Sequence, residues 1–348
     1  MLAGLWAFYL LRGELGTTHE LAEQILALAR DVEAPALLLH AYRIVGTSLL
    51  FRGELTAAQA SLEQAFTLYD PQQHRSHAFL YYGLDPGVIC LSFGALASWL
   101  LGYPDQALEK SHKALTLAQE LAHPMSLAFV LSFAASLHGF RVEPQATQGR
   151  AETLIALSNE RGLPLWETQG SIHLGWAWIE QEQVGEGIAQ MRQGLTTRRG
   201  LGVRLQETLY LAWLAKAQGK AGQVEEGLAT LAAAMEAVDE TRERINEAEL
   251  YRLKGELTMK KEVSGFKFQV SSLEEEAEEC FHKAIEIARR QGAKSLELRA
   301  VMSLARLWQK QGKKNEARQM LAEIYGWFTE GFDTADLKEA KALLEELS

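Results

Sequence analysis

Residues 100–108, LLGYPDQAL, have the composition of a short turn between two helices. Gly102 supplies the backbone freedom that such a turn needs, and the small residue Ala107 follows five positions later. The same pairing recurs as Gly13/Thr18, Gly53/Ala58, Gly222/Gly227 and Gly312/Ala317, with weaker copies at Arg141/Ala146, Glu182/Gly187 and Ser272/Ala277. Turn positions near 13, 53, 102, 141, 182, 222, 272 and 312 predict eight units with a period of about forty residues.

A second small residue precedes most of these turn positions by seven residues. The series is Gly46, Ala95, Ala134, Gly175, Ala215 and Ala305, with Gly255 displaced by an insertion. Small residues allow two helices to cross closely, because side-chain bulk sets the distance between helix axes. The order of residues resembles the tetratricopeptide repeat, which has about 34 residues, whereas HEAT-type repeats have about 40–47. We weigh order above period and predict a tetratricopeptide-like array with lengthened helices.

The predicted fold is all-α: a right-handed superhelix of about eight helix-turn-helix units, an α-solenoid with one extended concave face. The array covers residues 1–333. Residues 334–348, which begin with the candidate N-cap Thr334, form a capping helix. Residues 260–272, KKEVSGFKFQVSS, are an insertion that alternates like a strand, and a small hairpin and a loop both remain open for it.

The composition excludes several classes of protein. The 348 residues hold 35 Lys and Arg against 45 Asp and Glu, a net charge of −10, so the basic footprint of a nucleic-acid or anionic-membrane binder is missing. No charge-free apolar run is long enough to span a membrane. Cys90 and Cys280 cannot build a disulfide framework and indicate a reducing compartment, so we expect a cytoplasmic protein.

The sequence lacks motifs for catalysis, metal binding or cofactor binding. The segments QGKAG at 218–222 and QGKKN at 311–315 lack the leading glycine and the hydroxyl of a phosphate-binding loop. The segment HELAE at 19–23 has Glu23 where a zinc-protease helix needs its second histidine. We therefore expect no catalytic residue, no metal and no cofactor in this chain.

The inward positions of the first helix of each unit define a candidate groove for a partner. Counted from the turns, they include Ile89, Leu96, Trp99, Leu131, His138, Ile172, Trp176, Arg252, Arg299 and Arg306. In one interpretation, tightly curled helices bury these side chains against each other. In the other, they line a groove with an apolar, Trp-bearing N-terminal half and an Arg- and Glu-rich C-terminal half. Aromatic and Arg side chains are the usual anchors of protein recognition.

Several phrases of the sequence resemble a known family. They include LYDPQQHRSHAFLYYGLDPGVICLS (68–92), EAELYRLKGEL (247–257) and IYGWFTEGFDTADLKEAKALLEEL (324–347). They are similar to the C-terminal tetratricopeptide region of bacterial signalling proteins in which a class III adenylate or guanylate cyclase, or a protein kinase, precedes an AAA/STAND-type ATPase. The resemblance implies a regulatory sensor arm. The catalytic residues of that family would lie upstream of Met1, so we expect this chain to be a segment of a longer protein.

The expected function is therefore a non-catalytic interaction and sensor module. It would bind a protein or peptide partner in the concave groove and regulate an upstream ATPase or cyclase, and those upstream domains are themselves candidate partners. The alternative is a small-molecule-sensing domain in the same signalling context. Neither a nucleic acid nor a membrane is expected as a partner.

Overall fold

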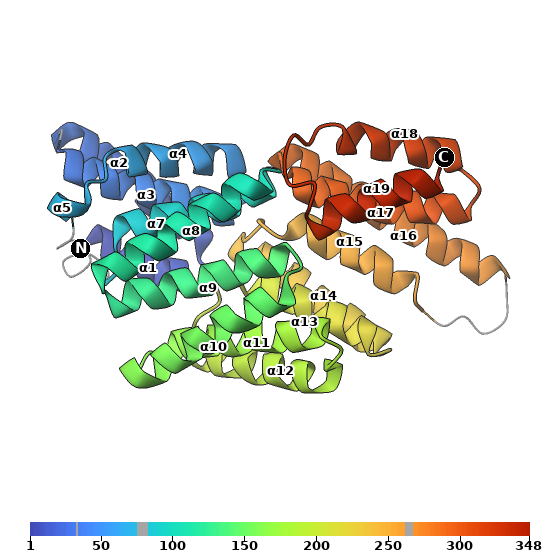
Figure 1. The fold of residues 1–348 in the computed structure, drawn as a ribbon, viewed down its shortest axis with the longest axis horizontal. Helices are drawn as coiled ribbons and strands as arrows, with labels where there is room; N and C mark the ends of the chain where they lie inside the picture. The colour runs from blue at the N-terminus through green and yellow to red at the C-terminus, as the bar shows by residue number, and fades with distance from the viewer. Residues whose placement is uncertain (33, 75–82, 262–266) are drawn as a thin grey trace.

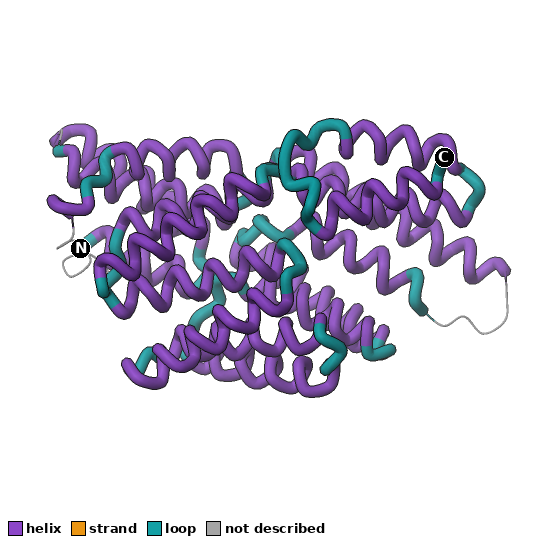
Figure 2. The backbone as a smooth tube through the Cα atoms, in the orientation of Figure 1, coloured by secondary structure: helices purple, strands orange, loops and turns teal. Residues whose placement is uncertain are grey.

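The computed structural model describes residues 1–32, 34–74, 83–261 and 267–348. Within these ranges the chain forms eighteen α-helices and no strand, joined mostly by short connections (Figure 2). None of these helices is both long and apolar enough to cross a lipid bilayer. The helical repeat architecture predicted from the sequence is confirmed.

The helices pair into eight antiparallel units followed by a terminal helix (Figure 1). The pairs are α1 (Leu2–Leu11) with α2 (Leu15–Val32), α3 (Pro35–Phe51) with α4 (Leu55–Thr67), α7 (Pro86–Leu100) with α8 (Pro104–Leu121), α9 (Pro124–Phe140) with α10 (Pro144–Arg161), α11 (Pro164–Glu180) with α12 (Val184–Gly200), α13 (Glu207–Lys220) with α14 (Val224–Thr241), α15 (Glu247–Thr258) with α16 (Lys267–Gln291), and α17 (Lys294–Lys310) with α18 (Lys314–Tyr325). The short helix α5 (Pro71–His74) follows α4, and α19 (Ala335–Glu346) is the terminal helix.

Proline fixes the start of seven helices. All seven prolines of the chain stand at the first residue of a helix: Pro35, Pro71, Pro86, Pro104, Pro124, Pro144 and Pro164. This position tolerates proline because its N–H has no partner within the helix and its φ is already helical. The fixed φ angle of proline thus helps to set the first residue of these seven helices.

Glycines at the predicted turn positions adopt the left-handed backbone conformation. Gly13, Gly53, Gly102, Gly222 and Gly312 all adopt positive φ, between 76° and 93°. In the fifth unit Glu182 takes the same conformation, with φ of 68°.

The predicted turn position of the fourth unit is wrong by one residue. Val142, rather than Arg141, has positive φ (58°), and the buried small residue that follows is Thr147 rather than Ala146. A β-branched residue rarely adopts this conformation, so Val142 is not recognisable as the turn residue from its type. With this correction the fourth unit has the same geometry as its neighbours.

The predicted turn position Ser272 is also wrong, because this residue lies inside α16. Residues 267–272 of the predicted 260–272 insertion form the start of that helix, whereas 262–266 lie outside the described residues. Extending an existing helix costs less than nucleating a new element. The Glu- and Ala-rich residues that follow are strong helix formers, and they outweigh the short alternating pattern.

Small residues lie where the two helices of a unit cross. A Cβ atom at Gly46 would lie 2.7 Å from Cγ of Leu62. A Cβ at Gly175 would lie 2.8 Å from both the carbonyl oxygen of Gly187 and Cγ of Met191. These distances are too short for a larger residue, which explains the spacing of small residues in the sequence.

The superhelix turns so tightly that units far apart in the sequence touch. The backbone N–H of Arg204 donates to the carbonyl oxygen of Leu11 at 2.8 Å, and the N–H of Arg244 donates to that of Phe51 at 2.9 Å. The ends of α1 and α3 therefore contact the connections that follow α12 and α14. We call this line of contacts the seam.

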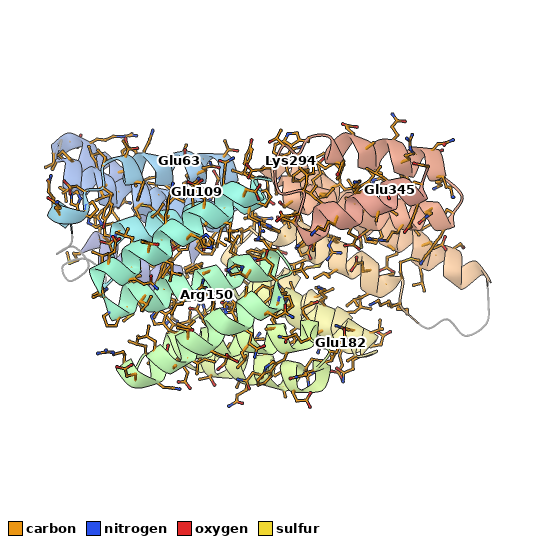
Figure 3. The ribbon with its side chains drawn as sticks, in the orientation of Figure 1. Glu63, Glu109, Arg150, Glu182, Lys294 and Glu345 are labelled. Atoms are coloured by element: carbon orange, nitrogen blue, oxygen red, sulfur yellow. The ribbon has the colours of Figure 1, made fainter. Side chains whose placement is uncertain are left out.

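A third seam contact joins the unit of α7 and α8 to the start of α17. The Ser295 hydroxyl donates to the carbonyl oxygen of Trp99 at 2.5 Å. A Cβ atom at Gly102 would lie 2.8 Å from Cβ of Lys294, which Figure 3 labels where the N-terminal and C-terminal helices meet. The glycine of this turn therefore provides both a positive φ and the close approach of a remote segment.

The terminal helix α19 continues the packing of the array. Thr334 stands at its N-cap, but its hydroxyl donates to the carbonyl oxygen of Gly331 at 2.7 Å and does not cap the helix. The connection before α19 also reaches the third unit, because the N–H of Gly331 donates to the Asp105 carboxylate at 3.0 Å. This segment thus ties the end of the array to its middle.

We predict opposite effects for two glycine substitutions in helices. Gly175→Ala should lower the free energy of unfolding by about 1–3 kcal/mol, because the added methyl overlaps the facing helix. Gly149→Ala should raise it by about 0.5–1 kcal/mol, since nothing lies within 4 Å of a Cβ there and alanine favours the helix. Urea denaturation of the two variants measures both values. Equal effects would contradict the close crossing at Gly175.

Candidate functional site

The concave side of the N-terminal half encloses an apolar cavity of about 560 Å³. The inner helices α1, α3, α7, α9 and α11 and the connections after α10 and α12 surround it. Its aromatic walls come from Trp6, Phe93, Phe129, Phe133 and Trp166. The charged and amide side chains in its lining are Arg43, Gln169, Arg198 and Gln206. We call it the apolar cavity.

The C-terminal half has a second, charged cavity of about 280 Å³ between α11, α13, α15, α17 and α19. The rings of Trp176 and Trp213 form one side of it. Its charged lining consists of Lys216, Glu249, Arg252, Glu256, Arg299, Arg306, Asp336 and Glu339. We call it the charged cavity. Four basic and four acidic side chains balance its formal charge.

An aromatic wall separates the two cavities. On α11, Gln169 lines the apolar cavity, Trp176 lines the charged one, and His173 lies one turn from each. Tyr210 has the same intermediate place on α13, and its ring centroid lies 5.9 Å from that of His173. The His173 ring lies 5.6 Å from the ring of Trp213. The helix α11 therefore runs from one cavity to the other through this wall.

His173 keeps the wall uncharged at neutral pH. Its Nδ1 lies 2.6 Å from the carbonyl oxygen of Gln169, which can only accept, so Nδ1 carries the hydrogen and donates it. Its Nε2 lies 2.8 Å from the Ser136 hydroxyl and acts as the acceptor. Burial lowers the pKa of His173 to about 4. The neutral imidazole is thus fixed in one tautomer.

A buried ion-pair cluster forms the floor of the charged cavity. Arg252 donates to the Glu249 carboxylate at 2.6 Å and to the Glu256 carboxylate at 2.5 Å. Burial alone would raise the pKa of Glu249, but the Arg252 charge outweighs it and holds that pKa below its usual value. Glu249 therefore stays ionised, and the Arg252 charge is paired with two acidic side chains.

Arg299 joins the charged cavity to the N-terminal half. Its guanidinium donates to the carbonyl oxygen of Phe140 at 2.5 Å and to the Asp336 carboxylate at 2.8 Å. Its Cζ also lies 4.9 Å from the ring centroid of Trp99. One side chain of α17 thus holds α9, α7 and α19, and the seam continues into the charged cavity.

The structure brings together only part of the predicted groove. Trp176, Arg252, Arg299 and Arg306 line the charged cavity, and Ile89 lines the apolar cavity. Arg306 pairs with Glu339 at the cavity rim, and its side chain keeps 39% of its surface exposed. Trp176, which the sequence pattern assigns to the apolar half, thus lies with the three arginines at the charged cavity.

The other predicted groove residues are packed inside the superhelix. Leu96, Trp99 and Leu131 are each 2% exposed. Ile172 is fully buried and faces α12, since its Cγ1 would lie 2.6 Å from a Cβ at Gly194. His138 pairs with Glu143 at 2.6 Å. For these positions the structure matches the interpretation in which curled helices bury their inner faces.

Sequence reasoning missed the buried charges beside the apolar cavity. Arg198 on α12 is 2% exposed and Glu243 after α14 is 1% exposed. Glu243 accepts hydrogen bonds from the N–H of Gln206 at 2.7 Å and from the Thr208 hydroxyl at 2.5 Å. Arg198 lies on the second helix of its unit, and Glu243 lies in the connection after another second helix. In an open solenoid both places are on the outer side. Only closure of the seam encloses them, so no local pattern indicates their burial.

Among the residues that the structure describes, no group of three or more His, Cys, Asp and Glu side chains is placed to hold a metal ion. The apolar cavity offers apolar contact and buried positive charge, and the charged cavity offers aromatic rings with paired charges. These features define a tetratricopeptide-like α-solenoid whose concave side is enclosed into two cavities.

Comparison with solved structures agrees with this fold class. No protein-family model matches the chain. A curated protein of Rhizobium meliloti (strain 1021), described as uncharacterized, is 22% identical over 302 residues, which cover 87% of this chain. The chain spans 28% of the length of that relative.

Many solved structures resemble this chain, and two of them illustrate the likeness. One is a Rap protein complexed with competence and sporulation factor, with a TM-score of 0.60, 11% identity, and coverage of 99% of this chain and 96% of the other. The second is NprR in complex with its cognate peptide NprX, with a TM-score of 0.57, 10% identity and coverage of 99% and 96%. At these identities the likeness establishes the fold alone.

We predict that Arg299 stabilises the closed array. Arg299→Leu should lower the free energy of unfolding by about 2–3 kcal/mol, because it removes two charge-assisted hydrogen bonds and leaves Asp336 without its partner. The control Arg192→Leu removes an exposed pair with Glu226 and should cost at most about 1 kcal/mol. Denaturation of both variants gives the comparison. Equal losses would show that Arg299 does not join the two halves.

We predict a pH-dependent contribution from Glu243. Burial raises its pKa from 4.5 to about 7, so the folded protein keeps a proton that the unfolded chain releases between these values. This group therefore lowers the free energy of unfolding as pH rises from about 5 to 8, by up to roughly 3 kcal/mol. In Glu243→Gln the contribution is absent, so the variant's stability relative to wild type should increase over this range.

Denaturation midpoints at several pH values between 5 and 8 measure this difference. The exposed Glu225 on α14 provides the matched control, because Glu225→Gln should give a difference that does not change with pH. A flat profile for Glu243→Gln would contradict the prediction.

Proposed function

We propose that the chain is a non-catalytic interaction and sensor module that binds a segment of a protein or peptide partner at the charged cavity. The observation that carries the proposal is the composition of that cavity. Trp176 and Trp213 present aromatic surface beside Arg299 and Arg306, and aromatic and Arg side chains provide most of the energy at protein interfaces. The paired acids Asp336 and Glu339 add specificity, since a partner must replace the ion pairs that it displaces.

The geometry also supports a way to transmit binding. Arg299 links the charged cavity to the carbonyl oxygen of Phe140 and to the ring of Trp99. A partner that competes for Arg299 weakens the contact between the two halves of the superhelix. Binding then shifts the array between a closed and a more open arrangement, as a ligand does when it has different affinities for two states.

The fold is compatible with this role. The Rap protein and NprR, whose structures resemble this chain, were solved in complex with competence and sporulation factor and with the cognate peptide NprX, respectively. Their ligands are not assigned to this chain. They support the proposal in that a solenoid of this architecture can hold a peptide.

We further propose that the module regulates ATPase or cyclase domains of the same polypeptide. The phrases of the sequence that resemble cyclase–ATPase fusion proteins support this role. The helix α1 carries an apolar surface to which another domain can dock, since Leu5 and Phe8 are 44% and 52% exposed. A domain that adjoins α1 would cover these side chains.

A second candidate function is small-molecule sensing in the same context. The apolar cavity favours it, because about 560 Å³ is within the range of ligand-binding pockets, roughly 300–1,000 Å³.

Substitution of Arg306 tests the leading proposal. Arg306→Glu reverses a charge at the rim of the charged cavity, and Arg318→Glu makes the same change at an exposed position on α18. Affinity capture from the native host, followed by mass spectrometry, should recover a partner with wild type and Arg318→Glu. The yield should fall at least about tenfold with Arg306→Glu, equivalent to about 1.4 kcal/mol. Identical capture by all three proteins would refute binding at the charged cavity.

A further inference from the structure

Arg198 is a buried cation with unused hydrogen-bond donors. It lies in the last turn of α12, is 2% exposed and lines the apolar cavity. Its Nη2 donates to the carbonyl oxygen of Leu205 at 2.6 Å, and its Cζ lies 5.5 Å from the ring centroid of Tyr210. Its Nε and Nη1 atoms are buried and have no hydrogen-bond partner among the described residues. Such unused donors carry a desolvation penalty.

The nearest acids do not neutralise this guanidinium by direct pairing. Glu207 is held by Arg199 at 2.6 Å and by Arg204 at 3.1 Å. Glu243 accepts from Gln206 and Thr208, and burial raises its pKa to about 7, so it is only partly ionised at neutral pH. Within the described ranges, no ion pair joins Arg198 to a carboxylate. A buried charge without a counterion is strongly destabilising.

The surroundings of Arg198 point to an anion that carries an apolar body. The cavity beside it is walled by aromatic rings, among them Phe129 and Trp166, whose centroids lie 5.8 Å apart. A second buried cation, Arg43, lines the same cavity, with its Cζ 5.5 Å from the ring centroid of Trp6. Among the described residues that line this cavity, none is Asp or Glu. The Arg198 charge therefore favours a negative ligand group, and the walls favour hydrocarbon.

We propose that the apolar cavity binds a small monocarboxylic acid with an apolar body, whose carboxylate pairs with Arg198. The hydrocarbon part lies against the aromatic walls and removes their surface from water. The carboxylate accepts hydrogen bonds from the guanidinium donors that the protein leaves unused, after a small displacement of the side chain towards the cavity. The inference does not depend on partner binding at the charged cavity, because the two sites lie on opposite sides of the aromatic wall.

Sodium decanoate and the neutral decanamide are matched probes for this site. They have the same hydrocarbon chain and differ in the charge of the head group. Isothermal titration of the full chain at neutral pH should show decanoate binding at least about tenfold more tightly than decanamide, since one charge-assisted contact is worth about 1.4 kcal/mol or more. Equal affinities, or no binding of decanoate, would overturn the proposal.

Substitution of Arg198 separates a ligand contact from a structural role. Arg198→Met removes the charge but keeps an unbranched side chain, so the unliganded variant should unfold at the same or a higher temperature than wild type. Its decanoate affinity should fall to that of decanamide, while its decanamide affinity stays within about twofold of wild type. The control Arg192→Met, an exposed position on the same helix, should leave both affinities unchanged.

Two results with these variants would contradict the proposal. A melting temperature for Arg198→Met well below that of wild type would mean that other groups of the protein already stabilise the Arg198 guanidinium. Unchanged decanoate affinity in Arg198→Met would place the carboxylate elsewhere. Neither result bears on capture of a partner by the Arg306 variants, so the two proposals fail independently.

Discussion

The hydrogen bonds of the seam, from the N–H groups of Arg204 and Arg244 to the carbonyl oxygens of Leu11 and Phe51, set the arrangement of the whole array. Repeat proteins are otherwise held together by contacts between neighbouring units alone. The carbonyl groups at the end of a helix have no partner within it, and the N–H groups of a connection are equally free. Pairing them across the seam satisfies both sets and requires no side chain to be ordered. The closed superhelix is therefore held by backbone hydrogen bonds at the ends of α1 and α3, together with the side chains of Ser295 and Arg299.

Closure decides which surfaces remain for function. It buries inner-face residues such as Leu96 and Trp99, and it leaves the two cavities on either side of the wall formed around His173. It also brings second-helix residues such as Arg198 into the interior, where an unpaired charge is costly. We propose a different ligand for each cavity: an apolar acid would pair with Arg198 in the apolar cavity, and a partner would compete with Arg299 at the charged cavity and loosen the seam.

Local patterns in the sequence predicted local structure well and remote contacts poorly. The Gly102 turn and its copies, and the small residue at Gly175, follow from steric limits that act within one unit. Trp176, Arg252, Arg299 and Arg306 line one cavity, because helical spacing puts them on the same side of their helices. Ser272 was misplaced since helix propagation overrides a short alternating run. The burial of Arg198 could not be predicted, because it depends on segments that are brought together only by the seam.

Residue-resolved hydrogen exchange at the backbone amides of Arg204 and Arg244 tests the closed superhelix most directly. Both amides lie in connections between helices, and their hydrogen-bond acceptors are the remote carbonyl groups of Leu11 and Phe51. Closure predicts that these amides exchange as slowly as those in the flanking helices α12 and α14. Exchange at the rate of freely solvated connections would show that the array is open in solution and would contradict the account.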